Sequence, residues 1–142
     1  MNLVITGGAG VNGLGFATAR KMAEHGATVV ILDLDRANPA HAARSLGEKH
    51  LGLVVDVTDK AACDTAAAAI GQAFGRLDIL VNNAGITQAA QTLNISGEDY
   101  DRILDVSLRG TLYMSQAALP FMRKQQSGSI ICISSVSAQR GG

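Results

Sequence analysis

Runs of apolar residues alternate along the chain with stretches whose apolar residues recur at helical spacing. Five apolar or β-branched runs predict strands at 3–6, 27–35, 51–57, 77–85 and 128–135. Four segments with helical periodicity predict helices at 13–25, 39–46, 58–75 and 96–124. The predicted strands and helices alternate strictly and are joined by short connections. This order predicts one parallel sheet with right-handed crossovers and helices on both faces.

Residues at the segment ends support these boundaries. Thr58 or Asp59 is a suitable N-cap for the third predicted helix, and Gly75 ends it. Ser96 begins the long helix 96–124 in the manner of a capping box, and Pro120 is expected to bend or end it.

Composition narrows the class of protein. The 142 residues are 47% apolar and only 4% aromatic, which suits a core of Ala, Val, Ile and Leu between helices and a sheet. Twelve basic and twelve acidic residues leave no net charge, so neither nucleic acid nor a membrane surface is expected as a partner. Without a signal peptide or an apolar run of about 18 residues, we expect a cytoplasmic protein.

The two cysteines, Cys63 and Cys132, lie far apart in apolar surroundings and match no metal-binding spacing. We therefore expect two buried, reduced thiols and no metal site.

Polar and glycine-rich residues follow the predicted strands. They occupy 6–15, 33, 56, 82–85 and 134–135. Ligands of open parallel sheets bind at the carboxyl ends of the strands, so these segments are expected to form one site.

The glycine-rich stretch after the first strand fits two registers. Gly8-Ala9-Gly10-Val11-Asn12-Gly13 spells the general dinucleotide fingerprint G-x-G-x-x-G, whereas Thr6-Gly7 with Gly13-Leu14-Gly15 spells a different loop. Either register would let a pyrophosphate approach backbone N–H groups at a helix N-terminus. Such turns also occur without any ligand.

Asp33 closes the second strand, 20 residues after Gly13, at the distance where an acidic side chain meets the adenosine ribose. A carboxylate accepts hydrogen bonds from the 2′- and 3′-hydroxyls and repels a 2′-phosphate, so NAD is expected over NADP. The alternative is a solvated carboxylate. Arg36 could pair with a phosphate, which would favour NADP instead.

Two further strand ends carry candidate ligands. Asp56 could accept from the adenine amino group while Val57 offers its backbone; alternatively, Asp56 caps the following helix or a turn. After the fourth strand, Asn82 is expected to tie strand ends together. Asn83 is the better ligand candidate, with small residues beside it.

Together, Thr6-Gly7…Gly13-Leu14-Gly15, Asp56-Val57, Asn82-Asn83-Ala84-Gly85 and Ile133-Ser134-Ser135 resemble the short-chain dehydrogenase/reductase family in order and spacing. The resemblance selects the Thr-Gly…Gly-x-Gly register. The loop is two residues longer than usual, so Val11 and Asn12 are implied as phosphate contacts. The implied cofactor-binding residues are Gly7, Val11, Asn12, Gly13, Leu14, Asp33, Asp56, Val57, Asn83, Ala84 and Gly85.

The family transfers hydride between a nicotinamide ring and an alcohol or carbonyl carbon. The resemblance implies Ser135 as the serine that binds the substrate oxygen, with Ser134 as its neighbour. Ser107 stands where the family usually has an asparagine that anchors a proton-relay water. The family's Tyr-x-x-x-Lys is absent, since Tyr100 and Tyr113 are followed four residues later by Leu and Ala.

We therefore predict an α/β, Rossmann-like doubly wound parallel sheet of order 3-2-1-4-5. Residues 1–142 are expected to form a single NAD(P)-binding domain, truncated after the fifth strand as the N-terminal portion of a longer chain, with the last strands missing. The predicted function is an NAD-dependent oxidoreductase of small alcohols or carbonyl compounds, active as a homodimer or homotetramer. The alternatives are a catalytically inactive dinucleotide sensor and, less favoured by the loop length, a relative of sugar-nucleotide epimerases.

Overall fold

The computed structural model describes residues 1–88 and 90–140 and contains one parallel five-stranded sheet. Its order, β3-β2-β1-β4-β5, confirms the predicted topology. The strands are β1 (Asn2–Thr6), β2 (Thr28–Asp33), β3 (Leu51–Val54), β4 (Ile79–Asn82) and β5 (Ser129–Cys132).

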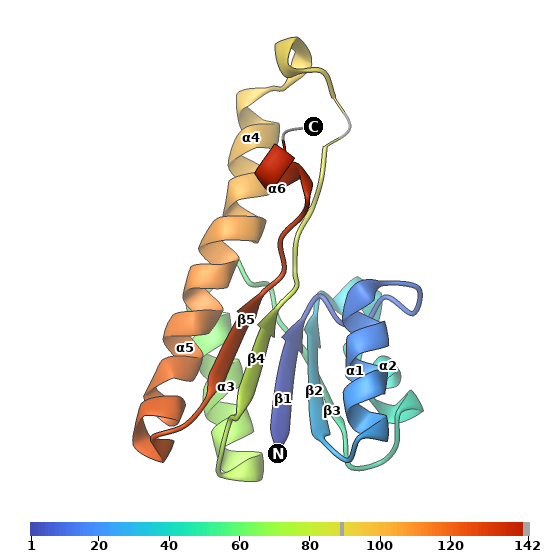
Figure 1. Cartoon of the computed structure of the whole chain (residues 1–142), viewed down its shortest axis with the longest axis vertical. Helices are drawn as coiled ribbons and strands as arrows, with labels where there is room; N and C mark the ends of the chain where they lie inside the picture. The colour runs from blue at the N-terminus through green and yellow to red at the C-terminus, as the bar shows by residue number, and fades with distance from the viewer. Residues whose placement is uncertain (89, 141–142) are drawn as a thin grey trace.

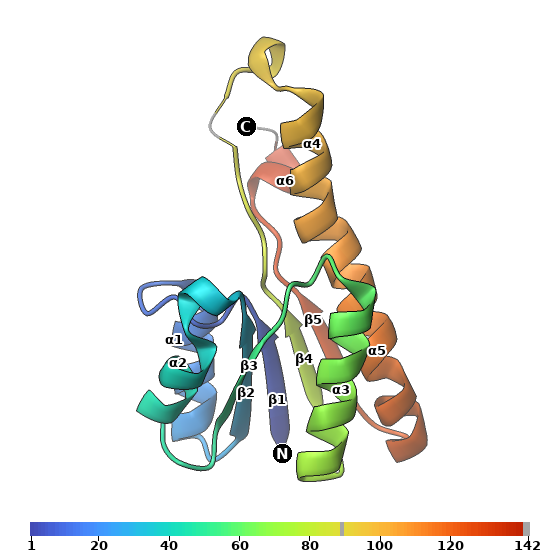
Figure 2. The same ribbon diagram turned by 180° about the vertical axis from the view of Figure 1, so that it is seen from behind.

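Helices cover both faces of this sheet, as Figures 1 and 2 show from opposite sides. The helices α1 (Leu14–Glu24) and α2 (Pro39–Ser45) lie on one face, and α3 (Lys60–Phe74) and α5 (Gly110–Gln125) lie on the other. The remaining helical segments are η1 (Asp35–Ala37), η2 (Thr92–Asn94), α4 (Gly97–Leu104), η3 (Asp105–Arg109) and α6 (Ser137–Arg140).

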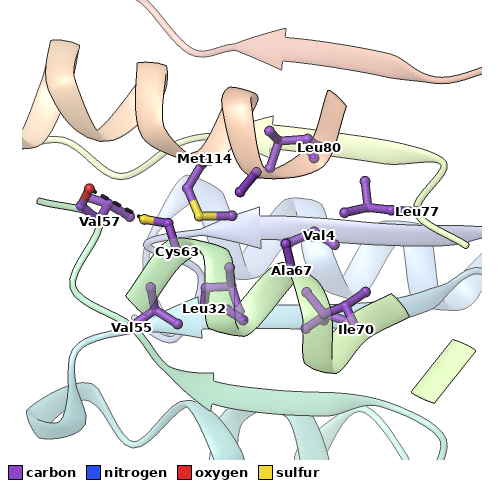
Figure 3. Packing of buried hydrophobic residues seen from close by; sticks show 14 of the residues in the cluster. Val4, Leu32, Val55, Val57, Cys63, Ala67, Ile70, Leu77, Leu80 and Met114 are labelled. Carbon is purple, nitrogen blue, oxygen red and sulfur yellow. Dashed lines mark hydrogen bonds between the residues drawn. The ribbon is translucent and has the colours of Figure 1, made fainter. Parts of the chain in front are cut away.

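The core has two halves because successive strand residues point to opposite faces. Val4, Leu32 and Leu80 face α3 and α5, where they pack with Met114 and Ile70 (Figure 3). The alternate residues of the same strands pack under α1 and α2: Leu3, Ile5, Val29, Ile31 and Val81. Burial on both faces explains why the strands read as continuous apolar runs.

Four of the five strands end earlier than the sequence suggests, and two of these ends bear on the site. The β3 strand stops at Val54 and β4 stops at Asn82, so Asp56 and Asn83 lie in loops beyond the sheet. At the first of these, the Asp56 carboxylate accepts the backbone N–H of Thr58 at 2.9 Å, which turns the chain away. Asp56 and Asn83, which the sequence predicted as ligands, therefore lie in loops at the strand ends.

The predicted helix 96–124 appears as an uninterrupted helical run from Gly97 to Gln125, but it is not one regular α-helix. Residues Asp105–Arg109 form a π-turn between α4 and α5. Pro120 lies inside α5 and does not end it. Figure 1 shows this run passing alongside the sheet and continuing beyond the carboxyl ends of the strands.

Of the two thiols expected to be buried, Cys63 is buried and Cys132 is not. Cys63 lies on the buried face of α3, its thiol donates to the Val57 carbonyl at 3.6 Å, and burial raises its pKa to about 11 (Figure 3). Cys132 is free but exposed, so the prediction that it is buried was wrong. Its strand, β5, pairs only with β4 among the described residues and leaves Cys132 at the sheet edge.

Just before β3 begins, a buried histidine side chain accepts a hydrogen bond from the backbone of β2. The backbone N–H of Val29 donates to Nδ1 of His50 at 3.0 Å, and His50 is 7% exposed. Burial lowers the pKa of His50 below 6.5, and the neighbouring Lys49 lowers it further. None of the helices in the described part of the chain is both long and apolar enough to cross a bilayer.

Candidate dinucleotide-binding site

A cleft of about 1190 Å³ opens at the carboxyl ends of β1 to β4. The sequence predicted six of its lining residues as cofactor ligands: Gly7, Asp33, Asp56, Val57, Ala84 and Gly85. Residues from four separate strand ends thus meet in one concavity, which is where open parallel sheets bind their ligands.

The glycine-rich loop forms a tight turn at one side of this cleft. The Gly13 N–H donates to the Gly10 carbonyl at 2.8 Å, and Gly13 is the N-cap of α1. Val11 is 68% exposed and Leu14 is 74% exposed. Val11, Asn12, Gly13 and Leu14 therefore lie on an exposed turn, where Gly10 lines the cleft and these four do not.

Steric contacts distinguish the two registers of this loop. Gly7 has φ +63°, and a Cβ there would lie 2.9 Å from the Cα of Ala84. A Cβ at Gly15 would lie 2.5 Å from the Gly7 carbonyl oxygen and 2.6 Å from Nδ2 of Asn83. At Gly10 a Cβ would meet nothing within 4 Å. Gly8 of the other register is also crowded, since a Cβ there would lie 2.9 Å from Cγ2 of Ile5. The positive φ of Gly7 and the backbone contact at Gly15 nevertheless favour the Thr-Gly…Gly-x-Gly register.

Asp33 joins the end of β2 to this loop. Its Oδ2 accepts the N–H of Ala9 at 2.9 Å, and its Oδ1 accepts the N–H of Leu34 at 2.8 Å. The carboxylate is therefore held in place and is not a freely solvated group. Arg36, which also lines the cleft, forms no ion pair with any described residue.

Asp56 has a local structural role at the end of β3. Its Oδ1 accepts from both the N–H and the hydroxyl of Thr58, at 2.9 and 2.8 Å. Asp59, rather than Thr58, caps α3 by accepting the N–H groups of Ala61 and Ala62. The alternative that Asp56 caps a turn is thus realised, while its Oδ2 has no protein partner among the described residues.

Thr6 and Asn83 join the ends of β1 and β4. The Thr6 hydroxyl oxygen accepts the backbone N–H groups of Asn83 and Ala84 at 3.1 and 2.9 Å. In return, Nδ2 of Asn83 donates to the carbonyls of Thr6 and Gly7 at 3.0 and 2.9 Å. Asn83, which the sequence favoured as a ligand, therefore also ties the ends of β1 and β4 together through its amide nitrogen.

Asn82 points to the opposite side of β4. It is 4% exposed, and its Nδ2 donates to the Ser115 hydroxyl at 3.1 Å and approaches the Cys132 sulfur at 3.9 Å. Its Oδ1 is buried without a partner among the described residues. Asn82 thus links β4 to α5 and β5, and it is structural as expected.

The two serines lie outside the cleft lining. Ser135 follows β5, is exposed, and accepts the N–H of Ser137 at 3.2 Å. Ser107 lies in the π-turn close to Gly85, since a Cβ at Gly85 would lie 3.7 Å from its Oγ. The Ser107 carbonyl accepts the Thr111 hydroxyl at 2.8 Å.

A wall contributed by α4 and the π-turn was not recognised in the sequence. It lines the cleft with Glu98, Asp101, Arg102, Asp105 and Val106. The two sides of this wall differ in burial. Asp99, Ile103 and Val106 are half-buried, and Val106 packs against the core. Glu98, Asp101 and Arg102 are exposed and present charged groups to the cleft.

The sequence matches the model of the short chain dehydrogenase family over residues 2–142. This chain belongs to the short-chain dehydrogenase family. Its glycine-rich loop, its Asn-Asn-Ala-Gly turn and its sheet order therefore have a common explanation in one family. The resemblance predicted from those residues is confirmed over nearly the whole chain.

Relatives of this chain come from several bacteria. An uncharacterized short-chain type dehydrogenase/reductase of Sinorhizobium fredii is 48% identical over 98% of the chain. A galactitol 2-dehydrogenase of Agrobacterium fabrum is 39% identical over 97% of the chain, and a 3-oxoacyl-[acyl-carrier-protein] reductase of Thermotoga maritima is 38% identical over 94%. The chain spans 56%, 54% and 54% of these relatives, respectively, or about half their length.

A solved structure has the same fold. The 3-ketoacyl-(acyl-carrier-protein) reductase of Brucella melitensis, complexed with NADH, superposes with a TM-score of 0.92 at 34% identity. The match covers 99% of this chain and 60% of that protein.

Proposed function

We propose that this chain binds NAD in the cleft and belongs to an oxidoreductase that transfers hydride between the nicotinamide and a small alcohol or carbonyl compound. The observation that carries the proposal is the Asp33 carboxylate, fixed at the cleft by the N–H groups of Ala9 and Leu34. Family membership and the NADH complex of the Brucella melitensis reductase support a nicotinamide dinucleotide.

The Asp33 carboxylate is suited to a ribose with free hydroxyls. Each of its oxygens accepts one backbone N–H and keeps a further acceptor position for a ribose hydroxyl. A 2′-phosphate at the same place would meet a fixed negative charge. NAD is therefore the proposed cofactor, and NADP is disfavoured although Arg36 is nearby.

The glycine-rich loop would hold the pyrophosphate. The backbone N–H groups of Val11, Asn12 and Leu14 donate to no group in the described part of the protein, and they precede or begin α1. Unpaired N–H groups at a helix N-terminus attract phosphate oxygens. Gly7 and Gly15 keep the loop close to Ala84 and Asn83, where a Cβ would separate them.

The adenine would lie between the ends of β3 and β4. Oδ2 of Asp56 is available to accept the adenine amino group, because Oδ1 alone bonds Thr58. Val57 would contribute backbone contacts, and Ala84 and Gly85 leave room for a flat ring. The side chain of Asn83 would contact the cofactor through Oδ1, since Nδ2 is occupied by two carbonyls.

Turnover requires groups beyond cofactor binding. We assign Ser135 to the substrate oxygen and Ser107 to a position in the proton relay. A tyrosine with a neighbouring lysine usually completes this chemistry in the family, but the 142 residues contain no Tyr-x-x-x-Lys.

Calorimetric titration of the chain with NAD⁺, NADH and NADP⁺ tests the proposal. We expect binding of NAD⁺ and NADH and weaker binding of NADP⁺. The Asp33→Asn variant keeps an acceptor for the Ala9 N–H but loses the charge, and it should reduce the preference for NAD⁺ over NADP⁺ by about tenfold. No binding of any dinucleotide, or an unchanged preference in the variant, would contradict the proposal.

The helical run that carries α4 and α5 is proposed to pair with a second copy of the chain. Leu108, Leu112 and Leu119 are 65%, 52% and 42% exposed along it. Large exposed apolar residues in one stripe favour association. We expect a homodimer or homotetramer that Leu112→Arg dissociates and Leu93→Arg, at the exposed tip of η2, leaves intact. Sedimentation velocity measures this, and a monomeric wild type would disprove the pairing.

A further inference from the structure

We propose that Glu98 and Asp101 of α4 determine cofactor specificity at long range, by disfavouring dinucleotides that carry an additional phosphate. This inference rests on the proposed dinucleotide function of the cleft. It differs from the role of Asp33, which would contact the ribose directly, because α4 forms a separate wall of the cleft and acts through its charge.

The lining of the cleft is strongly acidic for a site that would hold a pyrophosphate. It contains five carboxylates and two guanidinium groups, a net charge of −3: Asp33, Asp56, Glu98, Asp101, Asp105, Arg36 and Arg102. Each further negative charge on a ligand therefore costs binding free energy. A dinucleotide with a 2′-phosphate carries about two such charges more than NAD.

Within this wall, Glu98 and Asp101 are the uncompensated groups. Asp105 pairs with Arg109, and Arg102 lies 3.9 Å from Asp99. Glu98 and Asp101 take part in no ion pair or hydrogen bond with the described residues. Their charges are thus free to act on a ligand in the cleft.

Both carboxylates lie on the exposed side of α4. Asp99 and Ile103 of the same helix are half-buried, whereas Glu98 and Asp101 are exposed and line the cleft. Because α4 fully buries none of its residues, core packing does not require this acidic face.

The size of the effect follows from distance and screening. A cleft of about 1190 Å³ has walls on the order of 10 Å apart. At that separation, and at about 20 mM salt, one carboxylate should weaken binding of a doubly charged phosphate by about two- to fourfold. At about 500 mM salt the Debye length falls well below 10 Å and the effect should nearly vanish.

The test measures the ratio of the dissociation constants for NADP⁺ and NAD⁺ at both salt concentrations. Glu98→Gln and Asp101→Asn should each lower this ratio by about two- to fourfold at low salt and leave it unchanged at high salt. The matched control is Glu48→Gln, an exposed carboxylate without an ion pair at the opposite edge of the sheet, and its ratio should equal that of wild type. Thermal melting of each variant checks that the fold is kept.

The outcomes separate this inference from the proposed function. If NAD⁺ binds but the α4 variants match wild type at low salt, or differ equally at high salt, the long-range role is wrong and the cofactor assignment stands. If no dinucleotide binds, both are wrong. Should NADP⁺ bind wild type too weakly to titrate, the same variants are compared in an Asp33→Asn background, where its affinity is higher.

Discussion

The Thr6 hydroxyl oxygen accepts the backbone N–H of Ala84 at 2.9 Å, although 78 residues separate the two in sequence. Since Thr6 also accepts the N–H of Asn83 and is 1% exposed, Thr6→Val leaves two N–H groups without a partner. We expect the free energy of unfolding to fall by about 2–4 kcal/mol. Urea unfolding monitored by circular dichroism measures this change.

Thr6→Ser is the matched control for that substitution. It keeps the accepting oxygen and removes only a methyl group, so it should cost about 1 kcal/mol. Equal destabilisation by valine and serine would mean that packing, and not the two hydrogen bonds, explains the role of Thr6.

Gly15→Ala places a Cβ against the Gly7 carbonyl oxygen and Nδ2 of Asn83. Alanine ordinarily stabilises a helix, but here overpacking opposes it, and we expect a net loss of about 1–3 kcal/mol. The same change at Gly10, where a Cβ meets nothing within 4 Å, should be nearly neutral. Thermal unfolding of the two variants measures this difference, and equal melting temperatures would contradict the steric argument.

His50 should make stability depend on pH. Its pKa is lowered in the folded state from 6.5, so the unfolded chain binds more protons as the pH falls through that value. The free energy of unfolding should therefore decrease below about pH 6.5, by at most about 1.4 kcal/mol per pH unit, and level off below the folded pKa.

His50→Asn offers the Val29 N–H an acceptor that does not titrate. Urea unfolding at a series of pH values should show a smaller loss between pH 7.5 and 5.5 in this variant than in wild type. Parallel pH profiles would show that His50 does not cause the pH dependence.

The two thiols should react very differently. Burial raises the pKa of Cys63 to about 11, so about one molecule in a thousand carries its thiolate at pH 8. Cys132 is exposed. A maleimide at pH 8 should label one thiol per chain, with the second labelled only in denaturant, as mass spectrometry would show. Rapid labelling of the Cys132→Ser variant would disprove the burial of Cys63.

The centre of the sheet was predictable because β1, β2 and β4 are buried on both faces. Val29, Val30, Ile31 and Leu32 are all fully buried, and such a run has no helical or alternating period. The strand ends were less predictable, since Asp56 turns the chain through a local hydrogen bond that competes with the ladder. The exposure of Cys132 depends on which strand neighbours β5, which its own apolar surroundings do not reveal.

The site was predictable where a motif requires a backbone conformation, as at Gly7 with its positive φ. The roles of Asn82 and Asn83 were less predictable, because either amide could bond a neighbouring strand or a ligand. The α4 wall was missed because candidate ligands were expected only where strands end, whereas Glu98, Asp101 and Arg102 lie on a helix.

Because α4 buries no residue of its own, the charges it presents to the cleft are free of packing constraints. Substitutions there exchange one solvated side chain for another and leave the sheet intact. Ligand preference in this protein is therefore open to gradual adjustment, one surface residue at a time, without a compensating change in the interior.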